Sequence, residues 1–227
     1  LRSRRGTGCS QKTNGLFQTF DEISKAPTQA GAQPGDIRFV DVNKDGILDN
    51  SDRTDIGNPY PDFNWGITNN FKYKNIDFSF LVQGVQGGKV INGDPNYNES
   101  RRTIKIYNQN RWVSAANPGD GKTPFSTNGY NWMLTDYVIE NGSYFALREV
   151  NLGYTLPTSS IKKLKITSMR FYLSAQNLYF HTAKGYRSLN PEGRFSNGPY
   201  SSVLIDGYQR GAFPIPQTIT AGIDINF

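Results

Sequence analysis

Two runs of alternating apolar and polar residues, joined by a two-residue polar turn, constrain the fold of this chain more than any other feature. The first run ends at Tyr73 and the second begins at Ile76, with Lys74-Asn75 between them. Their apolar members are Phe63, Trp65, Ile67, Phe71, Tyr73, Ile76, Phe78, Phe80 and Val82. Alternation with a period of two is typical of strands that have one apolar and one polar side. Each run is long enough, at roughly 9–11 residues, to cross a lipid bilayer at a tilt.

Later segments of the chain repeat this pattern. Residues 144–157, 168–179 and 217–227 also alternate, and the last of them ends on an aromatic residue. Short turns alternate with long polar segments, which are residues 35–60, 85–143 and 180–216. Bacterial outer-membrane barrels combine short and long connections in this way. We therefore predict an all-β fold, a membrane-spanning antiparallel β-barrel to which this chain contributes about the last five strands.

The composition agrees with this prediction and argues against other classes of protein. Hydrophobic residues make up only 36% of the chain while aromatic residues reach 13%, as expected when strands carry apolar side chains on one face. The net charge of +6 comes from scattered Lys and Arg residues, so we expect no nucleic-acid binding. Cys9 is the only cysteine, which excludes a disulfide framework. Since neither a signal peptide nor a long apolar run is visible, we expect the chain to be part of a longer exported protein.

A dense run of oxygen ligands, DVNKDGILDNSD, begins at Asp41. Its spacing matches a twelve-residue calcium loop, in which Gly46 would allow the sharp turn. The candidate ligands at positions 1, 3, 5, 7, 9 and 12 are Asp41, Asn43, Asp45, the carbonyl of Ile47, Asp49 through a water, and Asp52. We predict a structural Ca²⁺ at this loop. The Asp at the last position is shorter than the usual Glu, which weakens the site or favours Mg²⁺. The alternative is a polar surface turn whose side chains bond to the local backbone.

The sequence predicts no catalytic site. His181 is the only histidine, so a Ser-His-Asp arrangement or a His-based metal centre is hard to build. Glu140, Glu149 and Glu192 are isolated, and no carboxylate pair for glycosidase chemistry can be argued. Aromatic residues of the long segments are candidates either for contact with a sugar or peptide or for packing: Tyr97, Tyr107, Trp112, Phe125, Tyr130, Trp132, Tyr186, Tyr200 and Tyr208.

Several motifs follow one another along nearly the whole chain: GDIRFVDVNKDGILDNSDR, IGNPYPDFNWG, YKNIDFSFLVQG, NRW, ENGSYFALREVNLGYTLP, SAQNLYF, GYRSLNPEG and FPIPQTITAGIDINF. In this order they resemble the C-terminal part of the SusC/RagA-like TonB-dependent outer-membrane transporters. The resemblance implies a barrel of about 22 strands, a plug domain, energy from the TonB complex and a SusD-like surface lipoprotein as a lid. It also implies import of a nutrient, an oligosaccharide or a peptide, across the outer membrane of a bacterium.

On this basis the chain divides into three parts. Residues 1–35 are expected to form a flanking segment or extracellular loop, residues 36–61 an extracellular loop with the calcium-loop motif, and residues 62–227 the barrel strands, long extracellular loops and terminal assembly strand. The short turns and the C-terminus at Phe227 are expected on the periplasmic side.

The alternation also predicts which side chains meet lipid and which meet the lumen. The residues expected to face lipid are Trp65, Phe71, Phe78, Phe80, Leu152, Tyr154, Phe171, Leu173 and Ile223. Those expected to face the lumen are Thr68, Asn70, Ser79, Arg170, Tyr172, Gln176 and Asp224.

Two other interpretations of the same strands stay open. A secreted, calcium-stabilised β-sandwich that binds carbohydrate would bury the apolar strand faces against one another. A barrel without transport activity could serve as an adhesin. Within the transporter interpretation, the sequence does not distinguish a glycan from a peptide substrate.

Overall fold

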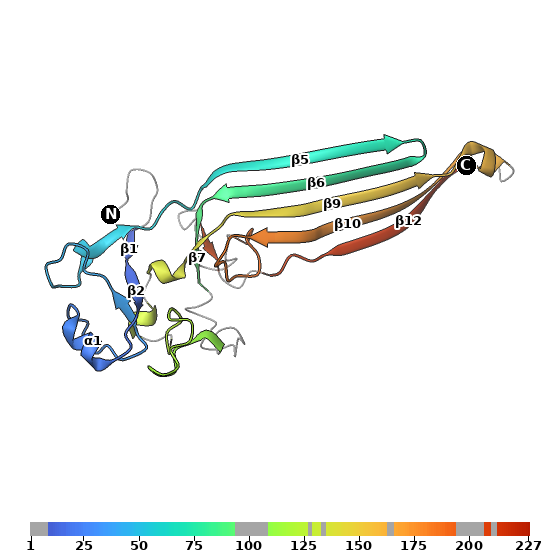
Figure 1. The fold of residues 1–227 in the computed structure, drawn as a ribbon. Helices are drawn as coiled ribbons and strands as arrows, with labels where there is room; N and C mark the ends of the chain where they lie inside the picture. Colours follow the sequence, from blue (N-terminus) through green and yellow to red (C-terminus); the bar gives the residue numbers. More distant parts are fainter. Residues whose placement is uncertain are drawn as a thin grey trace, which may run out of the picture. The chain divides into compact units, whose positions relative to one another are not determined.

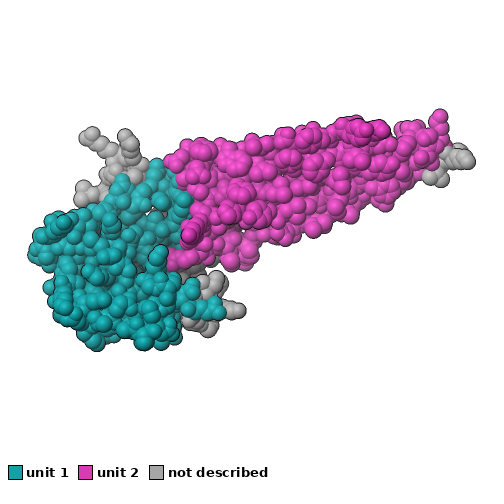
Figure 2. All heavy atoms as spheres, in the orientation of Figure 1, with its two compact units in different colours: residues 1–60, 88–141, 192–212 teal, residues 61–87, 142–191, 213–227 magenta. Residues whose placement is uncertain are grey.

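A computed structural model describes residues 9–93, 109–126, 129–132, 135–162, 166–193, 207–209 and 213–227. The chain divides into two compact units (Figure 2). Unit 1 consists of residues 1–60, 88–141 and 192–212, and unit 2 of residues 61–87, 142–191 and 213–227. Antiparallel strands dominate, as the sequence predicts. Within the described part of the chain, no helix has the length and apolar character needed to cross a membrane.

Unit 2 is built on one antiparallel sheet, whose strands run side by side in Figure 1. The strands are β5 (Pro61–Tyr73), β6 (Ile76–Gly87), β9 (Tyr144–Thr155), β10 (Ser168–Thr182) and β12 (Thr218–Asn226). Their order is β12-β10-β9-β6-β5, so each is hydrogen-bonded to the strand that precedes or follows it in this unit. These are the alternating runs of the sequence, and the strand prediction is confirmed.

Short connections join two of these strand pairs. Between β5 and β6, Tyr73 lies opposite Ile76 and the turn residue Lys74 adopts a left-handed conformation with φ of 52°. Between β9 and β10 the chain forms the short helix α4 (Thr158–Ile161), whose last residue is buried. A bulge interrupts β9 at Arg148, since Leu81 pairs with Glu149 and the next residue of β6 pairs with Leu147.

The cross-strand register assigns the alternating residues to two faces of the sheet. Phe71 lies opposite Phe78, Phe78 opposite Leu152, and Leu152 opposite Leu173. Directly opposed residues project to the same side, so the whole set expected to face lipid shares one face and the set expected to face the lumen shares the other. The apolar face is open: Phe71 is 56% exposed, Leu152 47% and Ile223 56%. A β-sandwich would bury this face, so the sandwich alternative loses support.

Unit 1 contains short strands that pair into small sheets. β1 (Cys9–Gln11) pairs with β4 (Arg53–Asp55), and β2 (Thr13–Leu16) pairs with β3 (Ile37–Phe39). A third sheet has the order β11 (Tyr208–Gln209), β7 (Lys89–Asn92), β8 (Ile139–Asn141). The helical turns are α1 (Phe20–Lys25), η1 (Asn50–Asp52), η2 (Gly129–Trp132) and η3 (Asp136–Val138).

A small apolar cluster and side-chain amides hold unit 1 together. The buried residues Leu16, Ile37 and Phe39 form the cluster, and Leu48, Trp112 and Tyr137 pack against it. The buried amide of Gln29 extends the edge of β3. Its Nε2 donates to the carbonyl of Ile37 at 2.8 Å and its Oε1 accepts from the N–H of Phe39 at 3.3 Å. The Gln29 side chain thus takes the place of a strand partner and satisfies these two backbone groups of β3.

Candidate functional site

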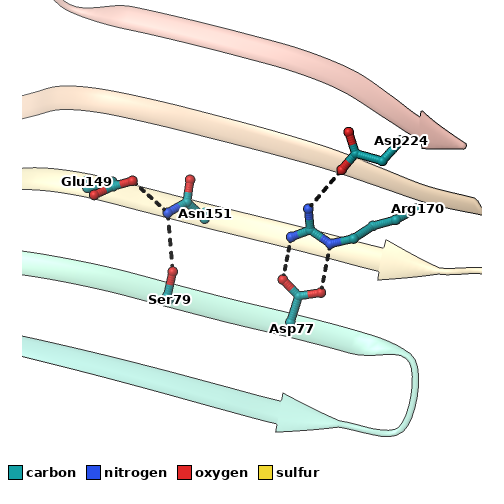
Figure 3. Close-up of polar contacts among 6 residues, drawn as sticks. All are labelled: Asp77, Ser79, Glu149, Asn151, Arg170 and Asp224. Atoms are coloured by element: carbon teal, nitrogen blue, oxygen red, sulfur yellow. Dashed lines mark hydrogen bonds and ion pairs between the residues drawn. The ribbon is translucent and has the colours of Figure 1, made fainter. Parts of the chain in front are cut away.

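The polar face of the sheet in unit 2 carries a charged network formed by residues of three strands, β6, β10 and β12 (Figure 3). Arg170 of β10 donates twice to Asp77 of β6, from Nε to Oδ1 at 3.2 Å and from Nη2 to Oδ2 at 2.6 Å. Its Nη1 lies 3.5 Å from Oδ2 of Asp224 on β12. The planar guanidinium allows this, because its N–H groups point in fixed directions and can bind two carboxylates at once.

Glycine makes room for this network. Asp77 and Arg170 are on strands separated by β9, and they meet above Gly153 of that strand. A Cβ at this glycine would lie 2.5 Å from each carboxylate oxygen of Asp77 and would overlap the Arg170 guanidinium. Gly222 of β12 is covered in the same way by the ring of Tyr172. Both glycines therefore allow side chains from the adjacent strands to lie directly over their backbone.

Further along the same face, amide and hydroxyl groups continue the polar surface. Asn151 donates from Nδ2 to Oγ of Ser79 at 3.3 Å and to Oε1 of Glu149 at 3.0 Å (Figure 3). At the bulge, Arg148 donates to Oδ1 of Asn177 at 3.0 Å. Positive and negative side chains are interspersed here. The face therefore offers hydrogen bonds to a polar solute or to another polar protein surface, without a strong field of one sign.

The acidic loop of unit 1 is closed by bonds between its side chains and its own backbone. Asp41 accepts from the N–H groups of Lys44 and Gly46 at 2.6 and 2.7 Å. Asn43 and Asp45 each accept the N–H group two residues further on, at 3.0 and 2.8 Å. These are the local contacts of a polar turn. The exposed side chain of Ile47 takes no part in them, and its backbone forms a β-bridge with Thr28.

The two remaining candidate ligands hold the end of this loop. Asp49 caps the helical turn η1 and accepts from the N–H of Ser51 at 2.6 Å. Asp52 is fully buried, and its two oxygens accept from the N–H groups of Val42 and Asp49 at 2.7 and 2.9 Å. The bond from Asp49, then those from Val42 and Asn43, hold the pKa of Asp52 below its ordinary value.

These contacts bear on the predicted cation. Among the described residues, no three His, Cys, Asp or Glu side chains are grouped so as to hold a metal ion. Backbone N–H groups donate to the carboxylate oxygens of Asp41 and Asp52, so hydrogen bonds within the loop contribute to its closure. The spacing of the ligands is suitable for Ca²⁺, and binding stays a prediction.

The aromatic candidates of the long segments include residues that pack inside unit 1. Nε1 of Trp112 donates to Oε1 of Gln18 at 2.9 Å, and its ring contacts Phe125 edge-on with centroids 6.5 Å apart. Gly35 lies directly against that ring with φ of +92°, a conformation that favours glycine. Trp112 therefore has a structural role. Outside the described residues or side chains lie Tyr97, Tyr107, Tyr130, Trp132 and Tyr200.

Sequence comparison finds relatives over most of the chain. No protein-family model matches it. TonB-dependent receptor P26 of Formosa agariphila is 29% identical over 216 residues, which are 94% of this chain and 22% of the receptor. TonB-dependent receptor SusC of Bacteroides thetaiotaomicron is 24% identical over 211 residues, 92% of this chain and 19% of that protein. The chain thus spans only a small part of the relatives it matches.

Structural comparison agrees on the fold. The RagAB peptide importer in the open-open state aligns with 97% of this chain and 22% of the matched chain, with a TM-score of 0.66 and 19% identity. The RagAB peptide transporter gives a TM-score of 0.67 with the same coverage and 18% identity. TonB-dependent receptors are transport proteins and not enzymes, in agreement with the prediction that the chain carries no catalytic site.

Proposed function

Because the chain is homologous over most of its length to TonB-dependent receptors of the SusC/RagA type, we propose that it forms the C-terminal wall of an outer-membrane nutrient importer. In this proposal its five strands continue a closed barrel, and the remaining strands and the plug belong to the same protein. The observation that carries the proposal is the open apolar face of the sheet in unit 2, opposite a polar face.

Aromatic residues near both ends of the apolar face support its placement in a membrane. At one end Phe145 packs beside Tyr179 and His181, with ring centroids 6.0 and 5.1 Å away. At the other end lie the exposed rings of Tyr73 and Tyr154. Because the bulge takes up one residue of β9, the rise from Phe145 to Tyr154 equals that from Gly84 to Ile76 on β6, about 27 Å, which a tilt of roughly 40° reduces to about 21 Å. The apolar band of such barrels is about 25 Å tall, with aromatic girdles on both sides.

A pair of neighbouring residues on β9 provides the test. Leu152 belongs to the apolar face and Asn151 to the polar face. In the intact protein with all native cysteines, Cys9 included, replaced by Ser, we would attach a fluorophore to Leu152→Cys or Asn151→Cys and add lipids that carry a quencher on the acyl chain. We expect strong quenching at position 152 and little at position 151. Equal quenching at both positions, or recovery of the protein without detergent, would contradict the proposal.

The imported solute is proposed to be an oligosaccharide or a peptide. The relative SusC and the RagAB peptide importer support this range, and the hydrogen-bonding groups of the polar face are suited to either. A SusD-like surface lipoprotein acts as the lid, and the TonB complex supplies the energy. Deleting the gene should abolish uptake of one solute class in cells given labelled oligosaccharides and labelled peptides separately. Unchanged uptake of both classes would refute this part.

The proposal also fixes the orientation of the strands and assigns a cation. The short turns after β5 and β9 face the periplasm together with the C-terminus, as short turns do in bacterial barrels. The Asp41–Asp52 loop then belongs to an extracellular segment, where a structural Ca²⁺ or Mg²⁺ would hold it. The ligand spacing supports this assignment. A protease added outside intact cells should cleave a site inserted after Asn50 and spare one inserted at Lys74-Asn75.

A further inference from the structure

The apolar face of β12 does not determine how this strand pairs with β10. Every second residue of β12 is apolar, so a shift of one residue would turn the apolar side chains to the opposite face. A shift of two residues in either direction would keep them where they are. Another feature must select the observed register, in which Gln176 lies opposite Thr218 and Ser168 opposite Asn226.

The polar face supplies three successive cross-strand pairs with specific contacts. They are Ser168–Asn226, Arg170–Asp224 and Tyr172–Gly222. In the first pair an amide Nδ2 donates to a hydroxyl at 2.7 Å. In the second a guanidinium nitrogen lies 3.5 Å from a carboxylate oxygen. In the third an aromatic ring covers a residue without a Cβ, and a Cβ there would overlap the ring.

We propose that these three pairs, which we call the register lock, select the pairing of the C-terminal strand from among the registers that its apolar face allows. A shift of two residues would place Arg170 opposite Gly222 or Asn226, and the ion pair would be lost. Tyr172 would then face a residue with a side chain, which occupies the space of its ring. Arg170 cannot follow the shift, because Asp77 on β6 holds it through two hydrogen bonds.

The choice of register determines where the outer edge of β12 lies. A two-residue shift moves the strand by about 7 Å along β10. None of the other described strands is hydrogen-bonded to that edge. In the barrel of the proposed function this edge would meet a strand from another part of the protein, and strand number and stagger are linked in a closed barrel. The register lock itself needs only the sheet of unit 2, and its test does not use transport.

Disulfide trapping can report the register. Residues directly opposite each other have Cβ atoms about 4.5–5.5 Å apart, whereas diagonal neighbours are about 7–8 Å apart, too far for a disulfide without movement. A cysteine at Thr218 would be combined with one at Gln176, which reports the observed register, or at Ser174, which reports a two-residue shift. All variants are made in the intact protein with all native cysteines, Cys9 included, replaced by Ser, oxidised in the membrane and analysed by mass spectrometry.

The decisive variant moves the lock along β12. The substitutions Thr220→Gly, Gly222→Asp and Asp224→Asn place the same residue types two positions earlier and leave the apolar face unchanged. We expect the disulfide from position 218 to move from position 176 to position 174. A disulfide that stays at 176 overturns the proposal.

A milder variant and a matched control complete the test. If the relocated variant does not accumulate, Arg170→Met with Tyr172→Ala should give a mixture of both disulfides, and trapping at 176 alone would overturn the proposal. Gln217→Ala removes a different contact between these segments, the bond from its Nε2 to the carbonyl of Leu178 at 2.9 Å. This control should keep the disulfide at 176. If the disulfide of Gln217→Ala moved to position 174, a contact outside the register lock would determine the register, which also overturns the proposal.

Discussion

Replacing Gly153 by Ala should break the ion pair that crosses above it. The added Cβ would lie 2.5 Å from both carboxylate oxygens of Asp77 and would overlap the guanidinium of Arg170. Both side chains end in flexible groups, so the backbone need not move, but the two bonds at 2.6 and 3.2 Å cannot persist together with the methyl group. A different glycine of the same face provides the control. At Gly66 the nearest atom to a new Cβ is 3.9 Å away, so Gly66→Ala meets ordinary packing.

The size of the effect follows from three contributions. The pair is partly solvated, with 33% and 38% of the two side chains exposed, and such a pair contributes about 0.5–1 kcal/mol. Crowding the site costs about 1–3 kcal/mol, at the lower end when the neighbours are flexible. Alanine recovers about 0.5–1 kcal/mol relative to glycine through the unfolded chain. We therefore expect Gly153→Ala to destabilise the sheet by about 1–2 kcal/mol, while Gly66→Ala is neutral or slightly stabilising.

A double-mutant cycle makes this prediction sharp. In a background with Asp77→Ala and Arg170→Ala, Gly153→Ala should become neutral or stabilising, which gives a coupling energy of about 2 kcal/mol. Stability would be measured in the intact protein from the urea concentration at which the folded, heat-modifiable band disappears. An equal loss of stability in both backgrounds would mean that the methyl group acts on something other than the ion pair, and the assignment of Gly153 would be wrong.

Four further changes have expected outcomes. Val150→Arg should cost roughly 2–4 kcal/mol, because Val150 lies on the apolar face midway between Phe145 and Tyr154, whereas Asn151→Arg on the polar face should cost much less; the folded fraction in membranes checks this. Deleting Phe227 should reduce the amount of inserted, heat-modifiable protein, and normal amounts would argue against an assembly role. Asp45→Ala, or metal removal, should increase hydrogen exchange in residues 41–52 without affecting the strands. If added calcium does not change hydrogen exchange of these residues, the loop is a polar turn. In the folded protein the pKa of Asp52 lies below its ordinary value of 3.8. The Asp52 carboxylate therefore contributes its full stabilisation above pH 3.8, and this is lost as the pH falls through the lower pKa of the folded state. Hydrogen exchange of the loop at pH 6 and pH 3, corrected for intrinsic rates, tests this.

The strands could be predicted from the sequence because successive side chains of a strand point to opposite faces of the sheet, and here one face is apolar and the other polar. Apolar residues at every second position identify the strand, its face and its approximate ends together. Two polar residues between two such runs, such as Lys74-Asn75, are enough only for a tight turn, so they predict a hairpin. The bulge at Arg148 also left a signal, since consecutive polar residues interrupt the alternation there.

Unit 1 carries no comparable signal. It is held by contacts between residues far apart in the sequence, such as the bond from Trp112 to Gln18, and by side chains such as the buried amide of Gln29, which bonds along β3. A glutamine that completes a sheet edge looks in the sequence like any polar loop residue. The partnership of Arg170 with Asp77 was hidden for a similar reason, because it depends on the register of three strands. Gly153 was the available signal, since glycine within an alternating strand often marks a close approach.

The acidic loop illustrates why ligand spacing alone does not decide function. The spacing of Asp41, Asn43 and Asp45 is that of a loop whose side-chain oxygens bind a hard cation. The same short side chains also reach the N–H groups two to five residues further on, which is how they are bonded here. Both outcomes need the same residues at the same positions. Only a measurement of cation binding distinguishes them.

The two faces of the sheet in unit 2 carry different kinds of information. Apolar contacts are non-directional, and their free energy depends mainly on the area removed from water. One apolar residue can therefore replace another, and a two-residue shift of the strand changes the free energy of these contacts little. Hydrogen bonds and ion pairs depend on distance and angle, so the pairs around Arg170 tolerate no such shift. We therefore expect Leu173→Ile or Ile223→Val on the apolar face to leave the register unchanged. Conservative changes in the lock, such as Arg170→Lys, should already weaken it, because an ammonium cannot bind Asp77 and Asp224 with the same geometry.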